Sequence, residues 1–421
     1  MLDLRLIRSD TDLVRAALSR RGADAALDDV VALDREARAT RTRVEAARAE
    51  RGKLSKAIGM AKRTGADTQA EEARSRELAE AMAADEERLR DTEARRDELL
   101  VALPNMAHPD APDGGEDDAV ELRRVGVLPQ LAEPVRDHVE IAEGLGGLDM
   151  NQASRVSGAR FAYLIGPLAR LQFALVSFAV DLLERRGFTP VVPPVLVREE
   201  AMYGTGFFPT DRASIYALAD DDLFLVGTSE VPLAGLGLDR ILEADELPLR
   251  FAGVSSCFRR ESGAAGRDTR GIFRVHQFDK VEMFTFCAPE DSDEEHRRIL
   301  ATEEEILGAL GLHYRVMDIP VGDLGASAAR KFDCEAWMPG QGRFREVTSC
   351  SNCTDYQARR LNCRSRGEGG NQTVHTLNGT AVAVGRTIIA ILENHQRPDG
   401  TVAVPEALVA HGAPEVLRPR A

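Results

Sequence analysis

The chain has 421 residues, of which 43% are hydrophobic and 29% are charged, and its formal net charge is -15. This length allows two or three domains with their own cores, and the negative charge argues against a uniformly basic nucleic-acid coat. The N-terminal residues are charged from Asp3 onward. The longest apolar stretch, 173–183, is interrupted by Asp181 and is shorter than the ~20 residues of a membrane span. We therefore expect a cytoplasmic protein without a membrane segment.

Two long helices are predicted near the N-terminus, after a short helix over 10–22 that begins at Ser9 or Asp10 and ends at Gly22. Over about 28–101, apolar residues recur every three or four positions, which is typical of helices that pack lengthwise. The first seam comprises Val30, Leu33, Ala37, Thr40, Val44, Ala47, Arg51, Leu54, Ile58 and Ala61, and the weaker second seam comprises Leu78, Met82, Leu89, Leu99 and Leu103. With a turn signal at Thr64-Gly65, this pattern predicts an antiparallel helical hairpin, which we call the arm.

The two halves of the arm carry opposite charges. Residues 35–63 hold ten Arg and Lys and three Glu, a net of +7, whereas residues 67–98 hold six Arg and twelve Asp and Glu, a net of -6. Opposite signs favour pairing of the two helices, and the remaining positive charge could contact a phosphate backbone. The residues alone leave open a second interpretation, a solvated coiled coil that acts as a spacer or dimerises.

A domain boundary is predicted after the arm. Residues 104–118 are rich in Pro, Gly and Asp and indicate a linker between a first domain, 1–103, and a second domain, 119–421. In the second domain, helices are expected over 168–187 and 291–310. Strands are expected over 191–197, 226–233, 249–259, 273–286 and 344–350. The fold class is therefore α+β, with a largely antiparallel sheet flanked by helices. The glycine patterns of P-loop and Rossmann sites are missing from the sequence.

A zinc site is not expected. Cys350 and Cys353 form the only short-spaced cysteine pair, whereas zinc usually takes four ligands from paired spacings. We expect reduced thiols.

Several polar pairs could form a site that binds a nucleotide and a small cationic substrate. Arg259 and Glu261 are predicted to share one strand face, and Phe278 and Glu282 to share another on the return strand. A guanidinium suits a phosphate or a carboxylate, and an aromatic ring can stack on a base. Taken singly, an exposed ion pair or a core phenylalanine would explain these residues better.

Further candidates follow the same reasoning. Thr228 and Glu230, placed on one strand face, could hold an ammonium group. Glu346 and Ser349 offer oxygen ligands for Mg²⁺, which is usually coordinated by few protein ligands together with phosphate oxygens. Arg386 follows a glycine at the start of a predicted helix, where it could reach adenine or a phosphate. Each of these is also consistent with an ordinary polar surface, so their combination carries the interpretation.

Three segments resemble the motifs of class II aminoacyl-tRNA synthetases. RRGFTPVVPPVLV (185–197), with Pro194, resembles motif 1, which forms the dimer interface in that class. FRRESG (258–263) with FRVHQFDKVEMF (273–284) resembles motif 2, and NGTAVAVGRTIIAILENHQ (378–396) resembles motif 3. RVHQFDKVEMF, REVTSCSNCTDYQARR (345–360) and the arm are together similar to the bacterial-type seryl-tRNA synthetases, and the resemblance covers essentially the whole chain.

The resemblance implies a role for individual residues. Arg259 and Arg386 would be catalytic. Serine would be bound by Thr228, Ser229, Glu230, Arg259, Glu282 and Thr380, where Thr replaces the Ser often found in the family. ATP would be bound by Arg259, Arg260, Glu261, Val275, Phe278, Glu346, Val347, Thr348, Ser349 and Arg386, with Mg²⁺ on Glu346 and Ser349.

The implied reaction is the ATP-dependent attachment of L-serine to tRNA(Ser) through seryl-adenylate, by a homodimer, and to tRNA(Sec) in cells that have it. One alternative is a serine-adenylating ligase that loads a carrier protein or a pathway intermediate. Another is a second, inhibitor-resistant seryl-tRNA synthetase linked to a pathway. A coiled-coil scaffold with an inactive catalytic domain would be expected to lack Arg259, Glu261 or Arg386, which are all present.

Overall fold

The computed structural model describes residues 1–262, 268, 270–367 and 369–420. The chain divides into two compact units, Leu2–Pro104 and Asn105–Ala421, and Met1 belongs with the second. Asn105, within the predicted linker, is buried in the second unit, where its backbone N–H donates to Ala326 O at 2.7 Å.

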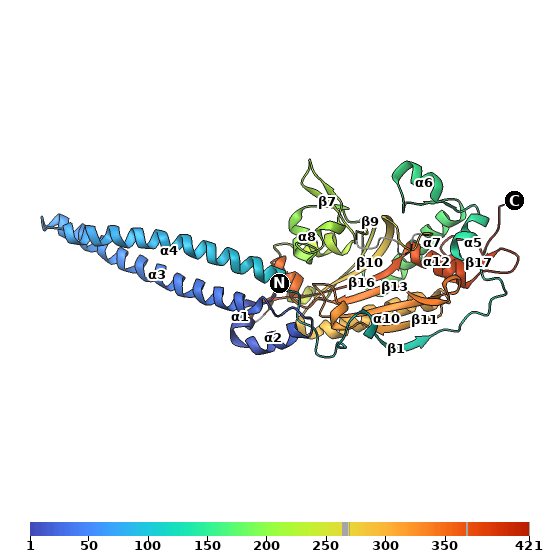
Figure 1. The fold of residues 1–421 in the computed structure, drawn as a ribbon, viewed down its shortest axis with the longest axis horizontal. Helices are drawn as coiled ribbons and strands as arrows, with labels where there is room; N and C mark the ends of the chain where they lie inside the picture. Colours follow the sequence, from blue (N-terminus) through green and yellow to red (C-terminus); the bar gives the residue numbers. More distant parts are fainter. Residues whose placement is uncertain (263–267, 269, 368, 421) are drawn as a thin grey trace. The chain divides into compact units, whose positions relative to one another are not determined.

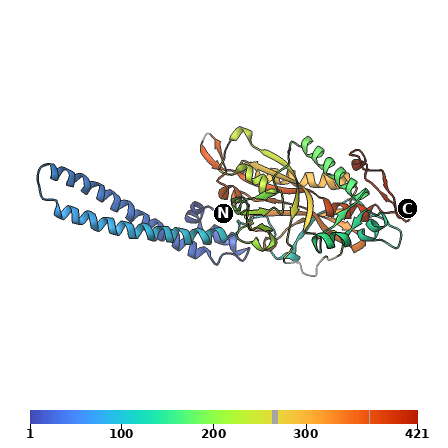
Figure 2. The same ribbon diagram turned by 90° about the horizontal axis from the view of Figure 1, so that it is seen from above.

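The first unit is helical and consists of α1 (Leu4–Ser9), α2 (Thr11–Ser19), α3 (Leu27–Arg63) and α4 (Gln69–Ala102). The predicted short helix is confirmed as α2, and Asp10 caps it by accepting a hydrogen bond from the Leu13 N–H. Helices α3 and α4 run side by side and form the predicted arm (Figures 1 and 2). Its first seam is confirmed near the base, because Val30, Ala37, Thr40 and Val44 are buried.

Opposite charges connect the two helices of the arm, as their charge difference predicts. Among the ion pairs between them are Arg41–Glu93, Arg43–Asp85, Arg48–Glu86, Lys62–Glu72, Arg74–Glu50 and Arg88–Glu36. These pairs are largely exposed, so each adds little stability, and they act mainly to fix which faces of the helices meet.

The second unit is built on an eight-stranded sheet with the order β1-β11-β12-β13-β16-β10-β9-β4. The strands are β1 (Val120–Val125), β4 (Thr189–Val191), β9 (Leu249–Phe258), β10 (Gln277–Cys287), β11 (Tyr314–Asp318), β12 (Arg330–Met338), β13 (Arg343–Asn352) and β16 (His375–Ala383). Every pair in this sheet is antiparallel except β4 with β9. The predicted α+β class with a largely antiparallel sheet is confirmed.

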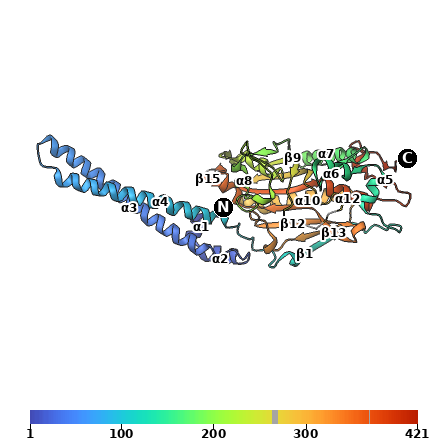
Figure 3. The same ribbon diagram turned by 45° about the horizontal axis from the view of Figure 1, so that its top comes forward.

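Three helices cover much of this sheet (Figure 3): α7 (Pro167–Arg185), α10 (Ser292–Ala309) and α12 (Val384–Asn394). Their apolar faces enter one core with the sheet, which includes Leu171, Ile299 and Ile388. The predicted helices over 168–187 and 291–310 are therefore confirmed. Helix α12 begins at Val384, so Arg386 lies in its first turn, as predicted.

The remaining elements are short. The helices are α5 (His138–Gly144), α6 (Met150–Ser157), α8 (Glu199–Thr205), α9 (Glu230–Ala234), α11 (Tyr356–Arg360) and α13 (Glu406–Val409). The strands are β2 (Leu148–Asp149), β3 (Tyr163–Leu164), β5 (Leu196–Val197), β6 (Ala217–Leu218), β7 (Leu223–Leu225), β8 (Ile241–Glu243), β14 (Arg364–Gly367), β15 (Gly370–Thr373), β17 (Val402–Ala403) and β18 (Val416–Leu417).

Three strand predictions were wrong in part. The predicted strand over 226–233 is a turn followed by α9, which packs closely against Gly253 of β9: a Cβ at Gly253 would lie 2.7 Å from Leu233. The predicted strand over 191–197 is divided between β4 and β5, which belong to different sheets. The predicted strand over 273–286 begins only at Gln277, as β10.

Candidate active site

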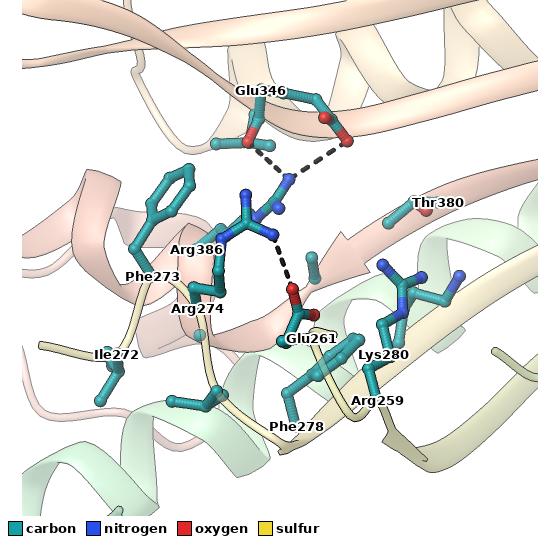
Figure 4. A pocket seen from close by; sticks show the side chains of 14 residues that line it. Arg259, Glu261, Ile272, Phe273, Arg274, Phe278, Lys280, Glu346, Thr380 and Arg386 are labelled. Atoms are coloured by element: carbon teal, nitrogen blue, oxygen red, sulfur yellow. Dashed lines mark hydrogen bonds and ion pairs between the residues drawn. The ribbon is translucent and has the colours of Figure 1, made fainter. Parts of the chain in front are cut away.

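One pocket brings together side chains from several elements and connecting segments of the second unit. Its walls come from β10, β13, β16 and α12, and from the segments 259–261 and 272–275 (Figure 4). Of the residues predicted for the site, it is lined by Arg259, Glu261, Val275, Phe278, Glu346, Val347, Thr380 and Arg386. The guanidinium groups of Arg259 and Arg386 thus share one cavity.

At one end of the pocket, Arg386 is held by Glu346. Its Nη1 donates to the Glu346 backbone oxygen at 3.0 Å and lies 3.1 Å from Glu346 Oε1, as the dashed lines of Figure 4 show. The ring of Phe273 contacts two guanidinium groups, with Arg345 at 3.7 Å and Arg386 at 4.7 Å from its centre. Burial acts to raise the pKa of the Glu346 carboxyl, but the neighbouring cations, Arg386 first, outweigh burial and lower that pKa.

Arg259 and Glu261 do not share a strand face, so that prediction was wrong. Strand β9 ends at Phe258, and Glu261 has a positive φ of 51°, outside strand geometry. Arg259 Nε donates to Gly227 O at 3.1 Å, and its guanidinium carbon lies 5.3 Å from the centre of the Phe278 ring. Glu261 accepts a hydrogen bond from Arg274 Nη1 at 2.6 Å.

Phe278 and Glu282 share one face of β10, as predicted by strand alternation, and Lys280 lies between them on that face. Lys280 forms a buried ion pair with Glu282, and its Nζ donates to Thr228 Oγ1 at 2.7 Å. Opposite Glu282 on β16 stands Thr380, whose hydroxyl lies 3.4 Å from Glu282 Oε2. Glu282 therefore lies directly behind two residues of the pocket lining.

The turn before α9 brings a second carboxylate close to Glu282. Thr228, Ser229 and Glu230 are buried, but they lie on a turn and a helix start rather than on the predicted strand face. Glu230 Oε1 accepts hydrogen bonds from Gln357 Nε2 at 2.7 Å and Asn378 Nδ2 at 3.1 Å. Burial raises the pKa of the Glu230 carboxyl to about 7, and the negative charge of Glu282 adds to the increase.

A β-bulge decides which side chains of β13 lie on the same face. The register against β12 shifts between Glu346 and Thr348, so Glu346 and Ser349 stand opposite Glu335 and Asp333, which share one face of β12. Thr348 is turned to the other face of the sheet, where its hydroxyl donates to Glu303 Oε2 at 2.9 Å. Without the bulge, residues three apart would face opposite ways.

The face that carries Glu346 and Ser349 is chemically suited to Mg²⁺. A carboxylate and a hydroxyl are hard oxygen donors, and Asp333 adds a carboxylate whose Oδ1 is buried without a hydrogen-bond partner in the structure. Burial raises the pKa of Asp333 to about 7 although Lys331 Nζ lies 3.1 Å away. Within the described ranges, no group of three or more His, Cys, Asp or Glu side chains could hold a metal by itself.

Several residues near the pocket were not predicted. Lys280, Ile272, Phe273, Arg274, Ala383 and Gly385 also line it. Lys280 could have been found, because it lies midway between two predicted residues on an alternating strand. Of the predicted residues outside the lining, Arg260 lies over the Tyr216 ring at 5.5 Å. Cys350 and Cys353 are buried and free of disulfide bonds.

Comparisons with known proteins agree along the whole chain. The family described as "Seryl-tRNA synthetase N-terminal domain" matches residues 1–107, and the family described as "tRNA synthetase class II core domain (G, H, P, S and T)" matches residues 216–395. The chain is 51% identical over 421 residues to a serine–tRNA ligase of Acidothermus cellulolyticus, with 100% of both chains covered.

Two solved structures are similar over their full length. The match to seryl-tRNA synthetase from Pyrococcus horikoshii, complexed with ATP, has a TM-score of 0.96 at 42% identity and covers 100% of both chains. Cytoplasmic serine–tRNA ligase from Naegleria fowleri, in complex with AMP, has a TM-score of 0.91 at 32% identity and covers 100% of this chain and 99% of that one. Across the described part of the chain, no helix has both the length and the apolar character to cross a bilayer.

Proposed function

The chain belongs to the seryl-tRNA synthetases, a family of class II aminoacyl-tRNA synthetases, and we propose that ATP and serine react in its Arg259–Arg386 pocket. The overall activity is the ATP-dependent attachment of L-serine to tRNA through seryl-adenylate. The observation that carries the proposed site is the convergence of Arg259, Arg386, Phe278 and Thr380 on one cavity, with Glu282 directly behind it.

The first step needs orientation and charge neutralisation more than proton transfer. The serine carboxylate attacks the α-phosphorus, and pyrophosphate leaves with the electron pair of the broken P–O bond. Arg259 would neutralise the α-phosphate and the attacking carboxylate, and Arg386 the outer phosphates, because fixed cations stabilise charge that develops in the transition state. The Glu346 contacts of Arg386 would hold it ready for this role. In the second step, the 3′-terminal ribose hydroxyl of the tRNA attacks the seryl carbonyl and loses its proton, and AMP leaves with the electron pair of the broken acyl C–O bond.

Adenine would lie on Phe278, beside the Arg259 guanidinium that already packs on this ring. The backbone at Val275 and the segments Arg260–Glu261 and Glu346–Ser349 would complete the ATP site. When ATP binds, the Glu261 carboxylate would exchange its Arg274 partner for the amino group of adenine.

Serine would occupy the floor of the pocket. Glu282, held by Lys280 and Thr380, would accept a hydrogen bond from the serine hydroxyl. The Thr228–Glu230 turn would bind the serine ammonium group, because the hydrogen-bond partners of the Glu230 carboxylate among the described residues are the side-chain amides of Gln357 and Asn378, which carry no charge. A buried carboxylate is costly when it is ionised and unpaired, so the serine ammonium group would stabilise the ionised form of Glu230.

Mg²⁺ would be held by Glu346 and Ser349 together with ATP oxygens, and when bound it would neutralise phosphate charge. Asp333 and Lys331 would keep the Ser349 side of this face ordered, since Asp333 stands opposite Ser349 in the sheet.

The arm would bind tRNA(Ser), and tRNA(Sec) where a cell has it, through the positive charge of residues 35–63. In this division, residues 1–103 form the tRNA-binding domain and 119–421 the catalytic domain. A homodimer would form through α7 and the segment after β4, where the apolar side chains of Phe173 and Val192 are 66% and 88% exposed. The enzyme would act in the cytoplasm.

The test is ATP–pyrophosphate exchange with serine, threonine, alanine and glycine, followed by charging of purified tRNA(Ser). We expect exchange with serine far above the other amino acids, and stable seryl-tRNA. Serine-dependent exchange without tRNA charging would point instead to a ligase that loads another acceptor.

A further inference from the structure

Four segments meet at one buried point beside the nucleotide end of the pocket. They are the start of α5 at Asp137–His138, the segment Gly271–Ile272, the turn at Gly340 between β12 and β13, and Glu393 on α12. We call this point the His138 junction. Three of these segments continue into pocket walls. Ile272 lines the pocket itself, the Gly340 turn leads into β13, and α12, which carries Glu393, also carries Arg386 in its first turn.

Glu393 is the acceptor at the centre of the junction. Its side chain is fully buried, and its Oε1 accepts from the His138 backbone N–H at 3.1 Å and lies 3.0 Å from His138 Nδ1. Its Oε2 accepts from the Gly340 N–H at 2.9 Å. A buried carboxylate is tolerated only when such donors satisfy it, so Glu393 fixes α5 and the β12–β13 turn against α12.

His138 extends this network to the wall of the pocket. The Ile272 backbone N–H donates to His138 Nε2 at 3.3 Å. Because Nε2 is then the acceptor, Nδ1 carries the proton and donates to Glu393, so both ring nitrogens are satisfied in the neutral imidazole. The imidazole therefore connects α12 to the segment that carries Ile272 and Phe273.

Two glycines make this close approach possible. A Cβ at Gly271, which has a φ of +77°, would lie 1.9 Å from His138 Nε2. A Cβ at Gly340 would lie 2.8 Å from Asp137 Cα and 3.1 Å from Glu393 Cδ. Any side chain at either position would push a pocket wall away from its neighbours.

From this geometry we propose that His138, with Glu393, is a positioning residue for ATP: it sets the spacing between the Ile272–Val275 wall, the Glu346 strand and Arg386. The serine end depends on other elements, namely α9, β10 and β16. The junction therefore acts on ATP binding and leaves serine binding nearly unchanged. This inference rests on the proposed function of the pocket.

The test measures Michaelis constants for ATP and for serine separately, in serine-dependent ATP–pyrophosphate exchange. In His138→Ala, the buried Ile272 N–H loses its acceptor, and we expect the KM for ATP to rise about tenfold with the KM for serine within about twofold. His138→Gln places an amide oxygen near the position of Nε2 and should restore most of the ATP affinity. His138→Asn reaches only Glu393, so it should restore little.

The matched control is His395→Ala. His395 is also partly buried and follows α12 directly, but its Nε2 contacts Leu310 O at 2.9 Å, away from the junction. We expect this variant to lose thermal stability while keeping both Michaelis constants within about twofold. Gly271→Ala should reproduce the selective loss of ATP affinity, because its Cβ would displace the imidazole.

Equal increases in both Michaelis constants, or an unchanged KM for ATP in folded His138→Ala, would overturn the inference. If His138→Ala fails to fold, the Gln and Asn variants decide, and equal KM values for ATP in these two would reject the Ile272 contact. Wild-type protein without serine-dependent exchange would instead refute the proposed function, so the two failures are distinguishable.

Discussion

The arm and the pocket are assembled in opposite ways. In the arm, α3 and α4 contact each other through positions that recur every three or four residues, and each contact resembles the next. In the pocket, every residue has a different neighbour, and Arg259, Glu346 and Arg386 reach the cavity from separate segments. A function spread over repeated contacts should decline gradually when they are removed, whereas the pocket should fail at single residues.

The largest expected effect therefore comes from one guanidinium of the pocket. Arg386→Ala should lower the rate of serine-dependent ATP–pyrophosphate exchange by roughly 10²–10³-fold, the usual loss when one fixed group that stabilises transition-state charge is removed. The matched control is Arg366→Ala, which removes an exposed arginine paired with Glu243. A loss below about fivefold for Arg386→Ala would remove Arg386 from the catalytic role.

Shortening the arm should separate the two regions. Residues 49–84 can be deleted and the hairpin closed with a short glycine turn. This variant keeps the ion pairs Arg43–Asp85 and Arg48–Glu86. We expect adenylate formation within about twofold of wild type, and a loss of roughly 100-fold in charging of tRNA(Ser), because phosphate contacts of the arm are lost. Charging at the wild-type rate would assign the arm another task.

Glu282 tests whether the floor of the pocket selects the substrate. Glu282→Gln keeps the shape of the side chain but removes the negative charge that strengthens its hydrogen bond with the serine hydroxyl. We therefore expect kcat/KM for serine to fall roughly 30-fold, while the weak activity with alanine changes little. The control is Glu243→Gln on the exposed strand β8. An unchanged serine-to-alanine ratio would contradict the assignment of Glu282 to the serine hydroxyl.

Glu230 makes a pH prediction for the same floor. Its pKa of about 7 means that the carboxyl is mostly protonated below pH 7 in the free enzyme. If the carboxylate binds the serine ammonium group, kcat/KM for serine should fall by up to tenfold per pH unit below about 7 and be level above it. In Glu230→Gln, kcat/KM for serine should be low but nearly independent of pH between 6 and 8. A decline seen only in kcat/KM for ATP would point to Asp333, whose pKa is also about 7.

The same contrast explains what the sequence could predict. The arm was predicted in length, pairing and charge because each of its contacts depends on local periodicity. The shared face of Phe278 and Glu282 was predicted because both residues lie inside the regular strand β10. In these cases the spacing along the chain determines the spacing in space.

The rest of the site depends on contacts that no local pattern records. The Thr228–Glu230 turn was predicted as a strand, and its packing depends on Gly253, in a different segment, which admits α9 against β9. Glu346 and Ser349 share a face only because of a bulge in the pairing of β13 with β12. Arg259 and Glu261 were placed on a strand that ends one residue earlier, at Phe258.

The smallest expected effect is in the arm, where two substitutions compare one of its repeated contacts with its specialised contact at Asp34. Arg48→Ala removes an exposed ion pair with Glu86 and should change the local free energy of opening of α4 by no more than about 0.5 kcal/mol. Asp34 is different, because its buried carboxylate accepts from Arg8 at 2.6 Å and 2.8 Å and from Arg38 at 3.1 Å, and lies 3.4 Å from Arg96.

Asp34→Asn leaves these cations without their carboxylate, so hydrogen exchange at the base of α3 and α4 should report a loss of about 3 kcal/mol. The Arg8 hydrogen bonds lower the pKa of Asp34 below 3.8. Its contribution should therefore be complete above that pH and be lost as the pH falls through the lowered value. Equal effects of the two substitutions would mean that the arm has no specialised contact and is repetitive along its whole length.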